Sequence, residues 1–455
     1  MDSLQIPKQK TFLNQLQDSV AAKLLIIGVL TLLLLIPSSW IQSLIYEREQ
    51  RQDEAINEIS EKWSGAQLIE SPVMQLPYKT SVKAIDVAGK ATFKEVMSTI
   101  YILPENLSIH SEVNPEILQR GIFDAVVYNT NIKVKGSFSQ LELKKSGINA
   151  EMIDWSKAKV IAGISDFKGL KSNPMIKVGD SLYAAEPDFS KENVFSNSIA
   201  IQIDLGASQK TALNFSLDMD LRGSRELNFL HLGRSTTVTV AGNWDTPSFT
   251  GNYLPEKRNT EGEKFTGKWK MSNFNRPFPQ QWETNNNALT VQNKEKATFG
   301  VKFLLPVDQY QKITRSAKYA ILVILLSFIS LFFIELLNKV RVNLLQYVLI
   351  GAAMIIYYSL LLSFTEQVGF EFAYLIASLS TIILISSFIG AFLKDKKAAV
   401  VFAIILGIFY SFIYVIIQLQ DLALLFGSIG LFITVACLMY FSVKINTSKQ
   451  EPVLT

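Results

Sequence analysis

The sequence predicts a membrane protein of the α+β class, with an N-terminal transmembrane helix, a large β-sandwich-like domain and a C-terminal bundle of five transmembrane helices, six in all. Three observations predict this fold. Apolar residues gather in one stretch near residue 30 and again after residue 319. The residues between these stretches alternate apolar and polar side chains with the period of a β-strand. The short connections between the apolar stretches carry lysine and arginine in alternation.

The first membrane helix is expected over Leu24–Ile45, after a cytoplasmic segment of residues 1–23. This stretch has no charged residue and exceeds the roughly 20 residues that a helix needs to cross the hydrocarbon core. A cleaved signal peptide is the alternative, with Pro37-Ser38-Ser39 before the cleavage point. Apolar residues continue beyond that point, which favours the membrane helix.

Five further apolar segments make up the predicted bundle, residues 319–443, and residues 444–455 are expected to form a cytoplasmic tail. Each segment must be helical, because lipid leaves no partner for unpaired backbone groups. The predicted spans are Ala320–Leu337, Leu344–Phe364, Phe372–Leu393, Ala398–Gln418 and Leu422–Val443.

Charges at the ends of the spans predict the orientation. One set of ends carries Lys8, Lys10, Lys23, Lys339, Arg341, Lys394, Lys396, Lys397, Lys444 and Lys449. The loops Thr365–Glu371 and Leu419–Asp421, at the opposite ends, have no lysine or arginine. Since basic residues accumulate in short cytoplasmic loops, we expect both termini in the cytoplasm. Residues 46–318 would then lie in the periplasm of a bacterial-type inner membrane.

The predicted periplasmic domain begins with a stalk helix over residues 46–63. Apolar residues recur there on one helical face, at Ile45, Ile56, Ile59 and Trp63. Beyond residue 65 the apolar period becomes that of a strand, which is typical of antiparallel sheets packed as a sandwich. About 250 residues of this pattern favour two subdomains, with a boundary near residues 168–191.

Two of the clearest strands predict a β-hairpin. Apolar residues alternate along Ile199–Leu205 and again along Leu213–Leu221. The connection Gly206–Lys210 has the composition of a turn, and two alternating runs joined by a short turn are a hairpin signal.

Signals for catalysis are scarce. The chain has two histidines, His110 and His231, and one cysteine, Cys437, so a zinc site of the usual ligand type is not expected. The phosphate-binding loop, the nucleophile elbow and the HExxH helix do not occur in the sequence. We therefore expect no cofactor, no metal and no enzymatic activity, and an ordinary structural role for His231.

The expected partners are the lipid bilayer and an envelope polymer or another inner-membrane protein. The net charge of +4 is small, and no basic stripe with interleaved aromatic residues occurs, so nucleic acid is not an expected partner. The sequence gives no oligomeric state.

The candidate binding residues lie between residues 222 and 255. They are Arg222, Arg225, Arg234, Trp244 and Phe249. An arginine trio is suited to hold an anionic envelope component by bidentate hydrogen bonds. In the alternative interpretation the arginines pair with Asp218, Asp220 and Glu226 across a hairpin, and the aromatic residues belong to a structural corner.

Glu335 is the one acidic residue inside a predicted span, and ionisable residues at bilayer depth often mark function. It lies four residues before Lys339, so a helix-surface ion pair is the expected explanation. Tyr357, Tyr358, Tyr410 and Tyr414 are candidates for a groove, although packing between helices is favoured.

Strings along nearly the whole chain resemble the CreD family of bacterial inner-membrane proteins. The strings include Trp63-Ser-Gly-Ala-Gln67, Leu221-Arg-Gly-Ser-Arg225, Leu232-Gly-Arg-Ser-Thr-Thr-Val238, Pro247-Ser-Phe-Thr-Gly251, Pro306-Val-Asp-Gln-Tyr-Gln311 and Phe332-Phe-Ile-Glu335. One departure is Ser71-Pro72, where the family tends to have Gly-Pro. The resemblance implies a link to envelope stress, with colicin tolerance and altered β-lactam response at raised levels. It implies no enzyme activity, no ligand and no catalytic residues.

Three functional hypotheses remain open. The first is a non-enzymatic protein of cell-envelope integrity whose periplasmic sheets bind an envelope component or partner. The second is a transporter or lipid-handling exporter that uses the helix bundle, which would require an apolar cavity there. The third is a modulator of a membrane sensor kinase.

Overall fold

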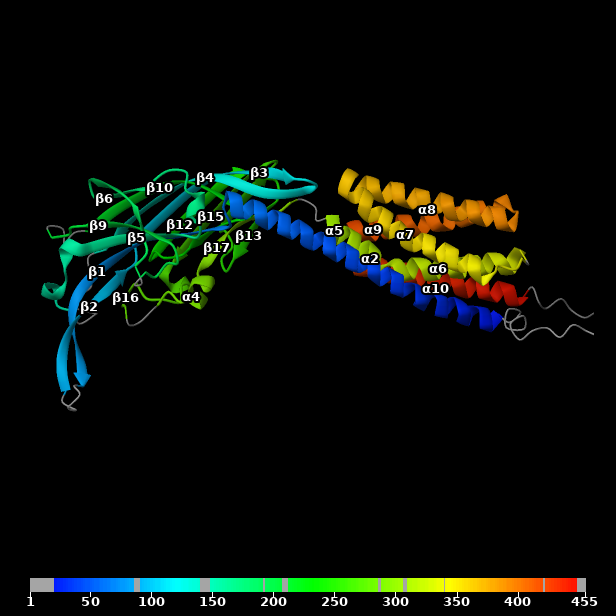
Figure 1. Ribbon diagram of the computed structural model, residues 1–455, viewed down its shortest axis with the longest axis horizontal. Coiled ribbons are helices and arrows are strands. Elements are labelled where there is room, and N and C mark those ends of the chain that lie inside the picture. The colour runs from blue at the N-terminus through cyan, green and yellow to red at the C-terminus, as the bar shows by residue number, and fades with distance from the viewer. Residues whose placement is uncertain are drawn as a thin grey trace, which may run out of the picture. The chain divides into compact units, whose positions relative to one another are not determined.

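The computed structural model describes residues 20–85, 91–139, 148–190, 193–206, 212–284, 288–305, 309–338, 340–419 and 422–447. The chain forms two compact units (Figure 1). The helical unit comprises Met1–Gln52 and Val307–Thr455, and the sheet unit comprises Asp53–Pro306. Most of the predicted N-terminal segment, the tail beyond residue 447, Lys339 and most of the Gly206–Lys210 connection lie outside the described residues.

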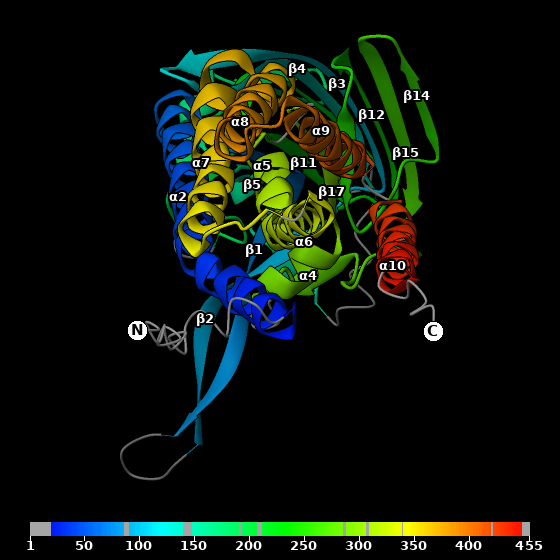
Figure 2. The same ribbon diagram turned by 90° about the vertical axis from the view of Figure 1, so that its right-hand side faces the viewer.

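The helical unit is built from long apolar helices. They are α2 (Val20–Trp63, as far as Gln52), α5 (Gln309–Lys318), α6 (Ala320–Asn338), α7 (Leu344–Val368), α8 (Phe370–Leu393), α9 (Lys396–Gln418) and α10 (Ala423–Thr447). Gly369, with φ of 80°, is the single residue between α7 and α8. Only glycine adopts this backbone conformation readily, so the glycine permits the abrupt reversal. Figure 2 looks along these helices and shows α10 at one side of the bundle.

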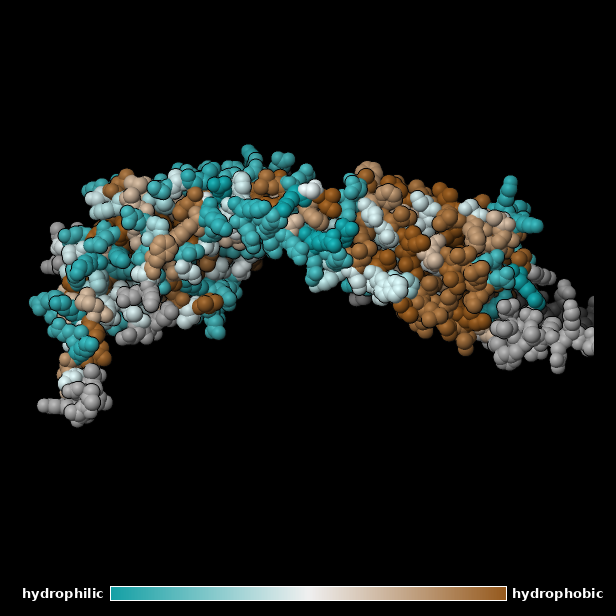
Figure 3. Space-filling model, in the orientation of Figure 1, coloured by the Kyte–Doolittle hydropathy of each residue, from teal (hydrophilic) through white to brown (hydrophobic). Residues whose placement is uncertain are grey.

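Four of the described helices, α2, α7, α8 and α9, are long and apolar enough to cross a membrane. Helices α5 and α6 add a fifth if the pair, which is bent by 42°, is one span. Helix α10 contains a shorter apolar part, Leu425–Ala436. The apolar surface is concentrated on the helical unit, while the sheet unit is mainly hydrophilic (Figure 3). An α+β chain with an N-terminal apolar helix, a sheet-rich domain and C-terminal apolar helices is therefore confirmed.

The sheet unit contains a nine-stranded and an eight-stranded sheet. The first consists of β1 (Gln67–Ile85), β2 (Ala91–Ile102), β5 (Ala158–Ile164), β8 (Glu186–Asp188), β9 (Ser198–Ile203), β11 (Glu226–Leu230), β13 (Pro247–Gly251), β16 (Gln281–Glu283) and β17 (Thr298–Phe303). The second consists of β3 (Asn106–Arg120), β4 (Phe123–Phe138), β6 (Met175–Val178), β7 (Ser181–Ala184), β10 (Leu213–Ser224), β12 (Ser235–Asn243), β14 (Lys257–Glu261) and β15 (Lys264–Ser272). Short helices accompany them: α4 (Val291–Lys296) and the 3₁₀ turns Ala150–Met152, Trp155–Lys157, Phe167–Gly169 and Asn273–Asn275.

Most strand pairs are antiparallel, but β1 pairs with β11 and β3 pairs with β12 in parallel. Strand β15 alternates fully between exposed and buried residues, with Phe265 and Trp269 on the buried face. The ring of Trp269 lies 5.3 Å from that of Phe299 in the other sheet. Alternating strands from both sheets thus bury their apolar faces in one shared core.

The predicted hairpin between Ile199–Leu205 and Leu213–Leu221 is wrong, although both strands exist. Strand β9 pairs with β5 and β8 in the nine-stranded sheet, and β10 pairs with β4 and β6 in the other sheet. Alternation of apolar and polar residues indicates that a strand has one buried face, but it does not identify the strand with which it pairs. The subdomain boundary near residues 168–191 stays a prediction.

Arg225 is the corner at which the chain passes from one sheet to the other. Strand β10 ends at Ser224 in the eight-stranded sheet, and β11 begins at Glu226 in the nine-stranded sheet. Arg225 has φ of 61°, its N–H donates to the Val126 carbonyl, and its own carbonyl accepts from Phe303 N–H. Both sheets therefore hold a non-glycine residue in a left-handed conformation that is uncommon and costly.

We expect Arg225→Val to lower the free energy of unfolding of the sheet unit by about 1–2 kcal/mol, because a β-branched residue tolerates positive φ poorly. Arg225→Gly should be at least as stable as the natural chain. Thermal unfolding of the purified full chain measures both effects, and Thr239→Val inside β12 is the control for adding valine to the sheet unit. An unchanged unfolding temperature for Arg225→Val would contradict the claim that the backbone at residue 225 is strained.

Candidate functional site

The three candidate arginines do not form one cluster. Arg222 and Arg225 lie at the end of β10, whereas Arg234 lies beyond the far end of β11, at the start of β12. Arg234 forms an ion pair of 2.9 Å with Glu105. The geometry therefore offers no single clamp of three guanidinium groups.

The alternative, in which these arginines pair with acids across a hairpin, is also wrong. Asp220 accepts a hydrogen bond of 2.6 Å from its cross-strand neighbour Asn131, and Glu226 pairs at 3.3 Å with its neighbour Lys302. Asp218, Asp220 and Arg222 all lie on one strand, β10, whereas Glu226 lies on β11 in the other sheet, so no hairpin brings these acids and arginines together as cross-strand neighbours.

The two candidate aromatic residues pack inside the sheet unit. Trp244 is 9% exposed, and its indole N–H donates to the Leu304 carbonyl at 3.1 Å. Half-buried Phe249 meets Trp269 edge to face, with ring centres 5.7 Å apart. Their positions favour a packing role, and ligand binding by these five residues stays a prediction.

Arg222 belongs to the junction between α2 and the sheets. Its guanidinium carbon lies 5.1 Å from the ring centre of Trp63, the last residue of α2. Next to it, buried Gln67 donates to the Ser64 hydroxyl and to the carbonyls of Asp166 and Arg222, at 2.9, 3.0 and 3.3 Å. Gln67 also accepts from Asp166 N–H at 3.3 Å. The hydrogen bonds of the Gln67 amide thus connect the turn after α2 to both sheets, so the junction has a structural function.

His231 has the expected structural role. One ring nitrogen lies 2.9 Å from the Thr236 hydroxyl and the other 2.9 Å from the Ser272 carbonyl. Burial, with a smaller contribution from Arg276, lowers the pKa of His231 from 6.5 to about 4, although its bond to Ser272 opposes this shift. The imidazole is therefore neutral near pH 7. Within the described residues, no group of three or more His, Cys, Asp or Glu is placed to hold a metal ion.

Glu335 has partners on α2 and near the start of α7, and its expected pairing with Lys339 lies outside the described residues. Its carboxylate pairs with Lys23 of α2, accepts from Val342 N–H at 3.2 Å and accepts from the Tyr347 hydroxyl at 3.3 Å. Glu335 is only 4% exposed. A buried carboxylate is tolerated when its charge is balanced and its oxygens are hydrogen-bonded, and here the balancing contacts join α2, α6 and the start of α7.

The tyrosines of the bundle pack against one another. The ring of Tyr357 lies 4.8 Å from that of Tyr358 and 4.7 Å from that of Tyr410. Tyr374 packs at 5.2 Å from Tyr414 and donates to the Tyr410 carbonyl at 2.7 Å. These contacts join α7, α8 and α9, which agrees with the interpretation as helix packing.

One exposed feature of the sheet unit was not predicted. Strands β1 and β2 continue beyond the core as a two-stranded ribbon, here defined as residues 79–85 and 91–97 (Figures 1 and 2). Among the described strands, these residues pair only with each other. Phe93 is 77% exposed and Met97 54%. They share a face with Lys79 and Glu95, so this face combines apolar and charged residues.

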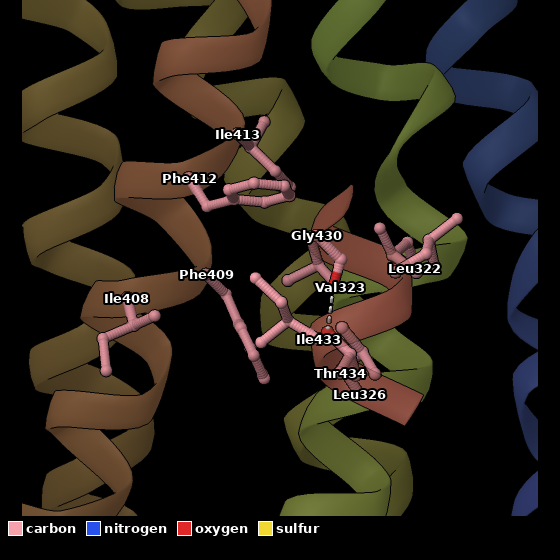
Figure 4. Close-up of a pocket in the computed structure, with 11 residues that line it drawn as sticks. Leu322, Val323, Leu326, Ile408, Phe409, Phe412, Ile413, Gly430, Ile433 and Thr434 are labelled. Atoms are coloured by element: carbon pink, nitrogen blue, oxygen red, sulfur yellow. Dashed lines mark hydrogen bonds between the residues drawn. The ribbon is translucent and has the colours of Figure 1, made fainter. Parts of the chain in front are cut away.

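An apolar groove lies in the helical unit between α6, α9 and α10 (Figure 4). Its volume is 170 Å³. It is lined by Leu322, Val323, Leu326, Ile408, Phe409, Phe412, Ile413, Gly430, Leu431, Ile433 and Thr434. The Thr434 hydroxyl donates to the Gly430 carbonyl at 2.8 Å, so the lining has no polar group that requires a ligand partner.

Sequence reasoning missed both features for different reasons. In the sequence, the apolar residues of the ribbon have the pattern of ordinary half-buried strands. In the structure Val82, Phe93 and Met97 are exposed, and the lysines between them were a usable signal that no other element covers the ribbon. The groove depends on how three helices separate, and no residue pattern within one apolar helix reports this.

Comparison with known proteins gives two findings. The model of the family described as "Inner membrane protein CreD" matches residues 19–448. The chain is also similar to a curated protein of that name from Escherichia coli (strain K12). The two are 28% identical over 415 residues, which cover 91% of each chain.

We expect Glu335→Gln to destabilise the helical unit by about 2 kcal/mol, because it leaves the partly buried Lys23 ammonium without a counter-charge. Lys23→Met should have a comparable effect. The double variant should lose less stability than the sum of the two single losses, since both remove the same ion pair. Thermal unfolding of the full chain in detergent measures the cycle, and strictly additive losses would rule out the coupling.

Proposed function

This chain belongs to the CreD family of inner membrane proteins, and we propose that it maintains the integrity of the cell envelope without catalysing a reaction. It is a multi-pass protein of the inner membrane. In the proposal, six helices cross the membrane: α2, α6, α7, α8, α9 and α10, with α5 leading into α6. Both termini lie in the cytoplasm, the sheet unit lies in the periplasm, and the protein acts during envelope stress.

The distribution of charge between the helices supports this orientation. Arg341, Lys394 and Lys396 follow α6 and α8, whereas the turn from α7 to α8 carries Glu366 and Glu371 without a basic residue. Since basic residues favour cytoplasmic loops, the ends of α2 and α9 and the starts of α6, α8 and α10 face outward. The sheet unit, inserted between α2 and α5, then lies outside the cytoplasm.

The single observation that carries the proposed binding function is the ribbon of residues 79–85 and 91–97. An isolated two-stranded hairpin is only marginally stable in water, and exposed strand edges readily add a partner. The ribbon also exposes Phe93 and Met97. Its sequence contains three lysines, Lys79, Lys83 and Lys94, against one acid, Glu95. Apolar and basic groups together suit a phosphate-bearing envelope component, so we assign the ribbon this ligand class.

A second candidate function is lipid handling by the helix bundle. The apolar groove between α6, α9 and α10 favours it, because a lipid-handling protein requires an apolar recess that opens toward the membrane. In this interpretation the groove holds lipid while the sheet unit contacts the envelope.

The orientation can be tested with single cysteines in a chain whose Cys437 is replaced by serine. We expect Asp180→Cys, at an exposed turn of the sheet unit, to react with a membrane-impermeant maleimide in spheroplasts. Lys396→Cys, at the start of α9, should react only after the membrane is lysed. The reverse pattern of labelling would show that the sheet unit faces the cytoplasm.

The ribbon is tested by Phe93→Ser combined with Met97→Ser. We expect the variant to fold normally, since both side chains are exposed, but to fail to restore growth of a deletion strain under envelope stress. Lys79→Glu with Lys94→Glu should give the same loss through charge reversal. Phe189→Ser, which removes another exposed phenylalanine of the sheet unit, is the matched control and should restore growth. Full growth with both ribbon variants would exclude the ribbon as the binding surface.

A further inference from the structure

We propose that the groove between α6, α9 and α10 binds a segment of one phospholipid acyl chain from the outer leaflet of the membrane. The inference deepens the second candidate function and rests on the proposed orientation for the choice of leaflet. Its basis is the shape, chemistry and depth of the groove.

The groove is a recess between helices. Val323 and Ile413, on its lining, are 2% and 3% exposed, whereas Ile408 and Ile433 are 60% and 55% exposed at its rim. A side chain at Gly430 would run into the ring of Phe412. The glycine therefore lets α10 approach α9 beside the recess, and Figure 4 shows these residues on adjoining helices.

The chemistry of the lining suits hydrocarbon and not a polar solute. Every lining residue except Gly430 and Thr434 has an apolar side chain, and the Thr434 hydroxyl is satisfied within its own helix. A polar ligand would lose its hydration without gaining hydrogen bonds, which is unfavourable. In the hydrocarbon core of the membrane the groove is surrounded by lipid acyl chains, so these chains are the ligand that is available to it.

The volume limits the occupant to part of a chain. An apolar cavity of about 150 Å³ holds a molecule of the size of benzene. The 170 Å³ of the groove therefore accommodates a segment of roughly six carbon atoms. A whole lipid or a partner helix would require a much longer recess.

The depth of the lining residues identifies the leaflet. In the proposed orientation α6 and α10 begin, and α9 ends, at the outer face. With a rise of about 1.5 Å per residue, Leu322–Leu326, Ile408–Ile413 and Gly430–Thr434 lie roughly 3–17 Å from those ends. The hydrocarbon core is about 30 Å thick, so all three segments lie mainly in its outer half.

The test uses the full chain in lipid nanodiscs that contain a phosphatidylethanolamine with a diazirine in the middle of one acyl chain. After illumination, adducts are mapped by peptide mass spectrometry. We expect labelling at Phe409, Phe412 and Thr434 to exceed, several-fold, labelling at Leu375 and Leu379, which are exposed residues of α8 at a similar depth. Equal labelling of the two regions would overturn the proposal, because it is the result of a non-specific lipid shell.

Filling the groove provides the matched comparison. Leu326→Trp should lower groove labelling several-fold, whereas Ile404→Trp, at an exposed position of α9 outside the groove, should leave it unchanged. If Leu326→Trp disrupts folding, Ile408→Trp at the exposed rim serves instead. Labelling that persists in the correctly folded filled variant would overturn the proposal.

The outcome is separable from that of the orientation test. Groove labelling without accessibility of a cysteine at residue 180 would retain the acyl-chain site and overturn its assignment to the outer leaflet. Accessibility of that cysteine without groove labelling would overturn the acyl-chain site and leave the orientation intact.

Discussion

Helix α2 is held by buried polar contacts near both of its ends, and both units depend on it. Near its start, Lys23 balances the charge of Glu335 within the helical unit. Beyond its end, Gln67 ties the Ser64 turn to the Asp166 and Arg222 backbone within the sheet unit. Buried polar groups are costly unless paired, so each contact specifies one arrangement within its own unit. The same helix therefore contributes to two separately packed structures.

Three of the sequence strings lie at these contacts of α2. The strings around Trp63–Gln67 and Leu221–Arg225 meet at the junction after α2, where Arg222 covers Trp63. The string that ends in Glu335 lies at the other contact of α2. These three strings thus lie at structural joints, while the surfaces suited to binding, the ribbon and the groove, lie elsewhere.

Much of the fold could be predicted from the local periodicity of the sequence, whereas the contacts between distant segments could not. The alternation of Leu213–Leu221 correctly predicted a strand, because a sheet with one buried face imposes a period of two. The same alternation gave the wrong neighbour for β9, since pairing across sheets is decided by the shared core. Glu335 was correctly singled out as unusual, but its partner Lys23 lies in a helix 312 residues away in sequence. The groove depends on what three packed helices leave uncovered and follows only from the packed structure, whereas the lysines of the ribbon were a signal that the sequence carried.

The neutral, enclosed state of His231 makes the sheet unit acid-sensitive. Burial holds its pKa at about 4 in the folded chain, against 6.5 when the ring is free in solution. Between pH 6.5 and about pH 4 the histidine binds a proton in the unfolded chain but not in the folded chain. The free energy of unfolding therefore declines as the pH falls through this interval. At about 1.4 kcal/mol per unit of pKa difference, the loss reaches a few kcal/mol. The sheet unit would therefore weaken in acid through one histidine that no solvent touches.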